Sequence, residues 1–175
     1  LTLLHLGPGV SACWASEKED HKILVVSFSH SGNTRALAEQ IHRLAGGDLF
    51  RIKTAEAYPR EYGAVVDIAK KEQSENRRPR LKTPLPDLRP YDVIFLGYPI
   101  WWGTMPMGVW TFLEGQDLSG KTILPFCTHE GSGLGRSPAD LARLCPRSTL
   151  REGLAVRGSQ VPGARKDVEA WVRKN

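Results

Sequence analysis

The sequence is poor in the cysteines that cross-link small folds, with only Cys13, Cys127 and Cys145 among 175 residues. Three is an odd number, and no two of them form a Cys-x-x-Cys pair. Both facts argue against a disulfide scaffold and against a zinc ribbon. We therefore expect buried, unpaired thiols.

Long apolar segments and compositional repeats are also missing. No apolar run approaches the ~18 residues of a membrane-spanning helix. Glycine and proline are scattered, which excludes a fibrous protein. The sequence is 41% hydrophobic and 25% charged, as expected of one globular domain with a sizeable core.

Acidic residues are fewer than basic ones. Residues 22–175 contain 23 Lys and Arg against 16 Asp and Glu, a net charge of +7. The densest basic cluster, Arg77, Arg78, Arg80 and Lys82, has no interleaved aromatic residues to stack on bases. We expect it to be a solvated loop and expect no nucleic-acid partner.

Residues 1–20 differ from the rest and are interpreted as a leader or tether outside the folded domain, which spans residues 21–175. The stretch from Val10 to Cys13 resembles a bacterial lipoprotein processing box. However, His5 and Gly7-Pro8 interrupt the preceding apolar run, and no basic segment comes before it. We expect a cytoplasmic protein, with a lipoprotein anchored to the membrane through Cys13 as the alternative.

Short, β-branched apolar runs alternate with segments of helical spacing. The runs suit strands buried on both faces and lie at residues 23–26, 49–52, 93–96, 123–126 and 154–156. Between them, apolar residues recur at helical intervals, as at Leu37, Ile41 and Leu44. This alternation predicts an α/β fold with a parallel sheet covered by helices on both faces.

Ligands of such sheets bind beyond the carboxyl ends of the strands. The first of these loops, residues 29–35, combines hydroxyl side chains, a glycine and an asparagine where a helix begins. Free N–H groups at a helix N-terminus bind anions, so this loop is predicted to hold a phosphate. The simpler alternative is a helix capped by Ser31 or Asn33 with no ligand.

The loops after the third and fourth apolar runs also have unusual compositions. Adjacent Trp101 and Trp102 cannot both point into one core from an extended segment. At least one of them is therefore expected at a pocket, where a planar aromatic ligand would stack. Gly131, Gly133 and Gly135 lie at alternate positions, which is typical of a backbone close to a ligand or of a flexible turn.

The Ser-His-Ser-Gly-Asn-Thr loop at 29–34 and the Gly-Tyr-Pro-Ile-Trp-Trp-Gly loop at 97–103 resemble those of the flavodoxins. The resemblance runs from about His21 to Val172. It implies a three-layer flavodoxin-like fold of the short-chain type, with a five-stranded parallel sheet in the order 2-1-3-4-5 and noncovalently bound FMN. The phosphate would lie at Ser29, His30, Ser31, Gly32, Asn33 and Thr34. The ring would lie between Pro99, Ile100, Trp101, Trp102, Gly103 and Thr104 on one side and Thr128, His129, Glu130, Gly131, Ser132 and Gly133 on the other.

Such a protein would be a bacterial electron carrier, transferring single electrons through the flavin semiquinone rather than acting as a stand-alone oxidoreductase. One alternative is an FMN-dependent NAD(P)H:quinone or azo reductase of the same fold, and another is a flavin-free binding module. The sequence departs from the flavodoxin pattern in its basic charge and in lacking an aromatic residue in the third loop. We expect redox partner proteins of acidic character. The ring would be stacked on one face only, unless Tyr58 or Trp102 covers the other.

Other chemistries fit the spacing poorly. The residues around Ser31 lack the glycines of a nucleophile elbow. Residues 130–137 lack the first glycine and the lysine of a P-loop. His30, His129 and Glu130 lack helical spacing and a third partner for a metal, so we expect no metal ion.

Overall fold

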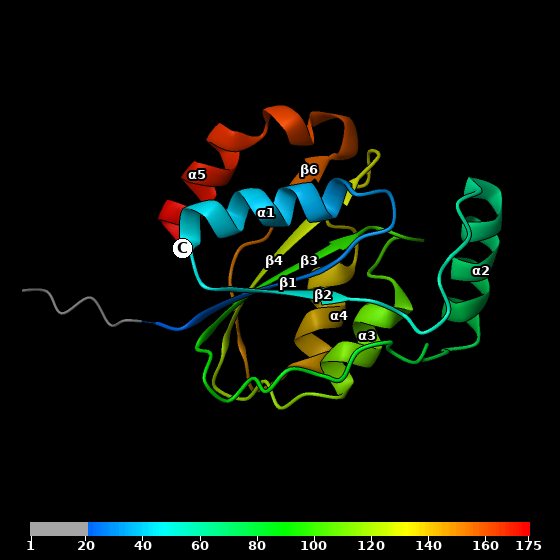
Figure 1. Cartoon of the computed structure of the whole chain (residues 1–175), viewed down its shortest axis with the longest axis horizontal. Coiled ribbons are helices and arrows are strands. Elements are labelled where there is room, and N and C mark those ends of the chain that lie inside the picture. The colour runs from blue at the N-terminus through cyan, green and yellow to red at the C-terminus, as the bar shows by residue number, and fades with distance from the viewer. Residues whose placement is uncertain (1–20) are drawn as a thin grey trace, which may run out of the picture.

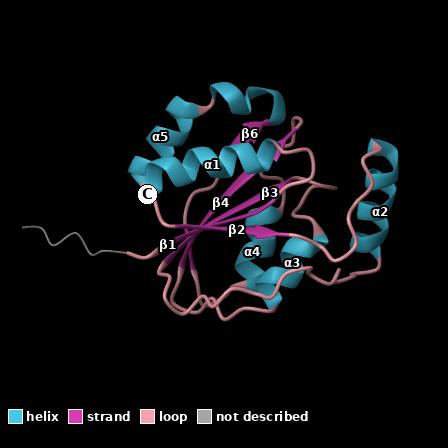
Figure 2. Cartoon of the chain, in the orientation of Figure 1, coloured by secondary structure: helices cyan, strands magenta, loops and turns pink. Residues whose placement is uncertain are grey.

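The computed structural model describes residues 21–175; the expected leader and the proposed anchor at Cys13 lie outside these residues. Strands and helices alternate along the chain (Figures 1 and 2). The strands are β1 (Ile23–Phe28), β2 (Asp48–Ile52), β3 (Val93–Pro99), β4 (Thr122–His129), β5 (Thr149–Leu150) and β6 (Leu154–Arg157). The helices are α1 (Asn33–Ala45), α2 (Tyr62–Ser74), α3 (Met107–Glu114), α4 (Ser137–Leu144), the 3-10 helix η1 (Gly158–Gly163) and α5 (Arg165–Lys174).

All strand pairs of the sheet are parallel, and the order is β2-β1-β3-β4-β5, with β6 also paired to β4. This order confirms the sequence-based expectation. The fifth strand differs from that expectation, because it is split into two segments, β5 and β6. Leu150 pairs with Ile123 and Leu154 pairs with Phe126, so the edge chain uses one more residue than β4 over this stretch, which is a bulge. Pro125, which has no N–H to donate, lies opposite the break.

Each face of the sheet carries its own hydrophobic core, and β1 is therefore buried on both sides. Leu24 and Val26 pack with α3 and α4, while Val25 packs with α1 and α5. Figure 1 shows these two helix pairs on opposite faces. Gly97 lets β3 and β4 approach, since a Cβ there would come within 2.1 Å of the Phe126 ring. The apolar runs of the sequence thus become a three-layer domain.

Helix α2 stands apart from the sheet (Figure 1). Of its residues, Val65 and Ala69 are buried, and Tyr62 is 81% exposed. The excursion that carries it is closed by an antiparallel bridge between Thr54 and Leu81. The chain therefore leaves β2, forms α2 beyond the sheet, and returns toward β3.

The basic cluster at 77–82 lies in this return segment and is mostly exposed, as expected of a solvated loop. Arg78 is the exception, because its guanidinium binds both carboxylate oxygens of Glu114 at 2.6 and 2.8 Å. It also lies 5.2 Å from the centre of the Trp110 ring.

None of the helices in residues 21–175 is both long and apolar enough to cross a membrane.

The two described cysteines are predicted to be unreactive in the folded protein. Burial raises the pKa of Cys127 to about 12 and that of Cys145 to about 11. The thiolate is the reactive form, so a Cys13→Ser variant should release almost no thionitrobenzoate from Ellman's reagent at pH 8. Two thiols should react after denaturation. Prompt reaction of the native variant would contradict the assigned burial.

Candidate functional site

Helix α1 begins directly above the carboxyl end of β1. Its N-cap is Gly32, whose φ of 103° is left-handed, and no side chain among the described residues caps the helix. The expected alternative, a helix capped by Ser31 or Asn33, is therefore wrong. The Ser29 hydroxyl accepts the Gly32 N–H at 3.2 Å and holds the loop closed. The first turn contains no acidic residue, so its amide groups can receive an anion.

Two side chains of this turn, those of Asn33 and Thr34, face the ends of β4 and β6. Thr34 is 1% exposed, and its hydroxyl lies 2.7 Å from that of Thr128 at the end of β4. A Cβ on Gly158 would lie 2.6 Å from Nδ2 of Asn33 and 2.5 Å from Oε1 of Glu130. Asn33, Glu130 and the start of η1 thus meet at one place, and the first and third predicted loops are neighbours.

Trp101 belongs to an aromatic cluster behind the first loop. Its ring packs edge-on against Tyr58 at 5.1 Å, Phe28 at 5.5 Å and His30 at 6.0 Å between centroids. The Nε2–H of His30 donates to the carbonyl of Pro59 at 2.8 Å. This cluster joins the first loop, residues 29–34, to the chain that leads into α2.

Trp102 points the other way and is strained. Trp101 and Thr104 exchange both backbone hydrogen bonds, closing a tight turn in which Trp102 has φ 49° and Gly103 has φ 80°. Two positive φ values are those of a type I′ turn. A bulky residue in this region costs about 1–3 kcal/mol, and such strain is concentrated at functional sites.

Contacts with α2 hold Trp102 in this position. Its Nε1–H donates to the carbonyl of Val66 at 3.0 Å, and the Lys70 ammonium lies 5.0 Å from the ring centre. The indole remains 45% exposed. The side chains of the two tryptophans therefore point apart, and Trp102 is the more exposed of the two.

The third loop approaches the second through backbone atoms. The N–H of Arg136 donates to the carbonyl of Gly103 at 2.8 Å. A Cβ on Gly135 would come within 2.4 Å of that same oxygen. Gly135 therefore serves the contact between loops, whereas Gly133 has nothing within 4 Å of its Cβ position.

Within the third loop, His129 organises its own backbone, because its Nδ1 accepts the Gly131 N–H at 2.9 Å. Ser132 is exposed, and its carbonyl accepts the Gly135 N–H at 3.3 Å. The loop is thus a folded turn whose outer surface is open.

Buried polar contacts support both loops from below. Thr104 is completely buried and donates its hydroxyl to Asp140 at 2.6 Å, so its side chain braces the turn instead of facing a ligand. The hydroxyl of Tyr98 donates to Ser137 at 3.0 Å, and burial raises the pKa of Tyr98. Asp140 and Ser137 carry no recognisable motif in the sequence.

Tyr58 and Glu72 form a polar pair at the base of α2. The Tyr58 hydroxyl donates to Oε2 of Glu72 at 2.6 Å. Burial, followed by this contact, raises the pKa of Tyr58, and burial likewise raises the pKa of Glu72. This pair fixes Tyr58 against Trp101.

The structure thus brings the three predicted loops to one edge of the sheet. Ser31, Trp102 and Glu130 are at least partly exposed, while Pro99 and Ile100 are partly buried at the end of β3. Residues 21–175 contain no group of three His, Cys, Asp or Glu side chains that could hold a metal ion.

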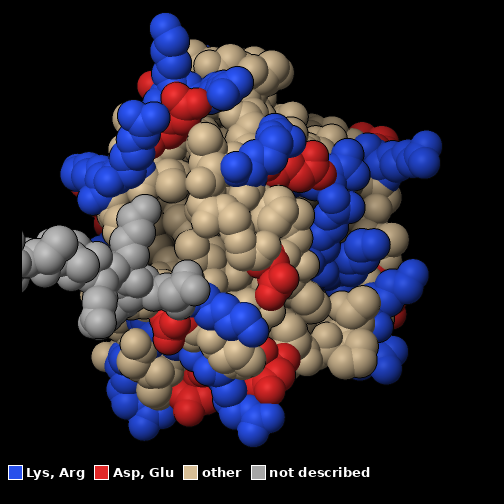
Figure 3. Space-filling model, turned by 60° about the vertical axis from the view of Figure 1, so that its left-hand side comes forward, with Lys and Arg blue, Asp and Glu red and all other residues tan. Residues whose placement is uncertain are grey.

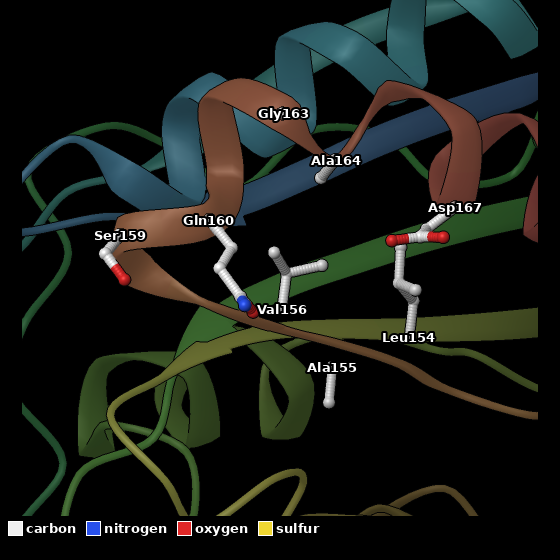
Figure 4. Close-up of a pocket in the computed structure, with 8 residues that line it drawn as sticks. All are labelled: Leu154, Ala155, Val156, Ser159, Gln160, Gly163, Ala164 and Asp167. Atoms are coloured by element: carbon white, nitrogen blue, oxygen red, sulfur yellow. The ribbon is translucent and has the colours of Figure 1, made fainter.

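A hollow of about 520 Å³ lies elsewhere in the molecule, along β6 beneath η1 and the start of α5 (Figure 4). Leu154, Gln160 and Asp167 are among its lining residues. Within the described chain, none of the predicted loop residues lines this hollow. The hollow is therefore separate from the candidate site.

Comparisons with known proteins agree with this geometry. The flavodoxin family model matches residues 22–175. A protein from Bacteroides eggerthii named as a flavoprotein is 33% identical, with a TM-score of 0.72, over 85% of this chain and 98% of that one. One from Bacteroides uniformis is 29% identical, with a TM-score of 0.78, over 87% and 98%. A Lactobacillus acidophilus flavoprotein solved in complex with FMN is 23% identical, with a TM-score of 0.68, over 82% and 97%. No curated protein matches the sequence.

Two glycine substitutions in the third loop should differ sharply in cost. Gly133 and Gly135 have nearly equal φ values of 59° and 55°, so alanine at either position costs about 1–2 kcal/mol from the left-handed backbone. Gly135→Ala should cost about 1–3 kcal/mol more, because its Cβ collides with the Gly103 carbonyl. Urea unfolding measures both. Equal losses would show that the two loops do not need this close approach.

Proposed function

This chain belongs to the flavodoxin family, and on that premise we propose that it is an FMN-binding electron-transfer protein. The observation that carries the proposal is the uncapped first turn of α1, which begins at left-handed Gly32 in a loop of hydroxyl side chains. This turn lies beside two further loops at the carboxyl edge of a parallel sheet, the place where such sheets bind ligands.

The phosphate end of FMN fits the residues present. Amide groups of the first α1 turn would donate to the phosphate oxygens, with the helix dipole adding to the attraction. Ser31 and Asn33 lie at the mouth of this turn and would add hydrogen bonds. Thr34 would act indirectly, since its contact with Thr128 fixes the start of the helix against β4.

The ring end would lie between the second and third loops. Trp102 is about half exposed, and its backbone is held by the tight turn. Its indole N–H donates to the carbonyl of Val66 in α2. The Gly103 carbonyl is held by Arg136, so that side of the turn is fixed before any ligand enters. When bound, FMN supplies the redox chemistry; the protein orients the ring and tunes its environment.

The net charge supports a redox partner of acidic character. Basic side chains are spread with acidic ones between them over the face seen in Figure 3, and basic residues are in excess in residues 22–175. Such an excess speeds encounter with an acidic surface at low ionic strength.

The phosphate assignment predicts which ligand loses affinity on mutation. Ser31→Ala and Asn33→Ala should each weaken FMN binding by about one to two decades, at roughly 1.5–3 kcal/mol per charge-assisted hydrogen bond. Riboflavin, which lacks the phosphate, should bind almost unchanged. Flavin fluorescence quenching measures both affinities.

The matched control is Ser119→Ala, in the turn before β4 at the opposite end of the sheet, which should affect neither flavin. Equal losses of FMN and riboflavin affinity would place the phosphate elsewhere. A purified chain that binds no FMN would instead support the flavin-free binding module.

Rapid mixing with NADPH separates the carrier from the reductase alternative. A carrier has no need to bind the nicotinamide beside the ring, so the FMN-loaded protein should keep its oxidised-flavin absorbance for minutes when NADPH is its only reductant. Photoreduction of the same sample is the positive control. Bleaching within a second of adding NADPH would instead establish the NAD(P)H-dependent enzyme.

A further inference from the structure

The side chains of the first α1 turn point to two sides, and the proposed flavin site uses the side chains on only one of them. Asn33 and Thr34 face the ends of β4 and β6, through Thr128 and Gly158. Arg35 faces the opposite way, toward β2, where its guanidinium approaches Glu39 and Gly32. Since β2 and β4 lie on opposite sides of β1 in the sheet, the two sides of this turn serve different spaces.

A small cavity of about 150 Å³ lies on the β2 side of this turn. Ser27 and Arg51 are register partners on β1 and β2, and both line it. The other lining residues are Ser29, His30, Gly32, Arg35, Ile52 and Lys53. The cavity therefore lies between the ends of β1 and β2 and the first turn of α1. It shares Ser29, His30 and Gly32 with the predicted phosphate loop, whereas none of the residues of the second and third loops lines it.

The charges around this cavity are only partly balanced. One carboxylate oxygen of Glu39 lies 3.0 Å from the guanidinium of Arg51 and 3.9 Å from that of Arg35. Lys53 has no ion-pair partner within residues 21–175. Three cations against one carboxylate leave an excess of positive charge next to two serine hydroxyls.

The chemistry and the size of this cavity match one tetrahedral oxyanion. Guanidinium groups bind phosphate oxygens in pairs, and an ammonium and hydroxyls add further donors. Sites for whole drug-sized ligands have volumes of about 300–1,000 Å³, so this cavity suits a single group of a ligand. We propose that it binds the phosphate of a second, non-flavin ligand next to the FMN phosphate.

This inference rests on the proposed function in one respect, namely that the flavin phosphate occupies the Asn33 side of the α1 turn. Glu39 then has a defined role. It holds Arg35 and Arg51 in place when the cavity is empty and competes with the incoming anion for both guanidinium groups. Its removal should strengthen anion binding, a gain that damage to the fold would not produce.

The experiment is a titration of the FMN-saturated, ¹⁵N-labelled protein with inorganic phosphate at constant ionic strength, followed by amide NMR. Saturable shifts are expected at Ile52 and Lys53. Arg51→Gln and Lys53→Gln should each raise the Kd for phosphate roughly tenfold, and Glu39→Gln should lower it. Arg43→Gln, which removes the same charge from the last turn of α1, should leave it within about twofold.

Absence of saturable shifts, or equal effects of Arg51→Gln and Arg43→Gln, would overturn the proposal. So would release of FMN by phosphate, because the cavity would then be the flavin phosphate site. A glutamate-rich peptide that binds more tightly than phosphate and competes with it would also overturn the proposal, since the cavity would then be a protein contact. If the chain binds no FMN, the same titration of the flavin-free protein still decides: shifts at Lys53 support the cavity, and shifts confined to Asn33 and Thr34 overturn it.

Discussion

The left-handed backbone of Gly32 determines where α1 begins, and the site is arranged around that point. With φ at 103°, the chain turns sharply out of buried β1 and enters the helix without a side-chain cap. The free amide groups of the first turn are thereby placed at the carboxyl edge of the sheet. Thr34 then locks this turn to Thr128 on β4, so the amide groups are fixed relative to the third loop. An anion at this position would meet donors already in place, without the cost of ordering a loop.

The second constraint is backbone contact between the two remaining loops. Arg136 donates to the Gly103 carbonyl, and Gly135 leaves the space for that approach. The strained Trp102 lies in the turn that this contact braces, and its indole is bound to Val66 of α2. Helix α2 buries little apolar surface of its own. Its position therefore depends on the tryptophan loop and on the Tyr58–Glu72 pair as much as the loop depends on α2.

Much of the fold could be predicted from the sequence because local rules apply to it. The apolar runs at 23–26, 93–96 and 123–126 are buried on both faces, and the strand order expected from the flavodoxin resemblance is confirmed. The split of the fifth position into β5 and β6 was missed. A two-residue strand has no periodicity, and the bulge opposite Pro125 depends on pairing with a strand distant in the sequence.

The sequence alone indicated the family through its loop motifs and predicted the layers from its alternating segments. It also predicted that three loops meet at one edge, because parallel strands place all their carboxyl ends together. The contacts that the residues of those loops make are visible only in the folded chain. The tertiary structure turned Thr34 toward Thr128, buried Thr104 against Asp140 and separated Trp101 from Trp102. It also gathered Arg35, Arg51 and Lys53 around one cavity. These outcomes depend on contacts between segments far apart in the chain, and no spacing within a single loop encodes them.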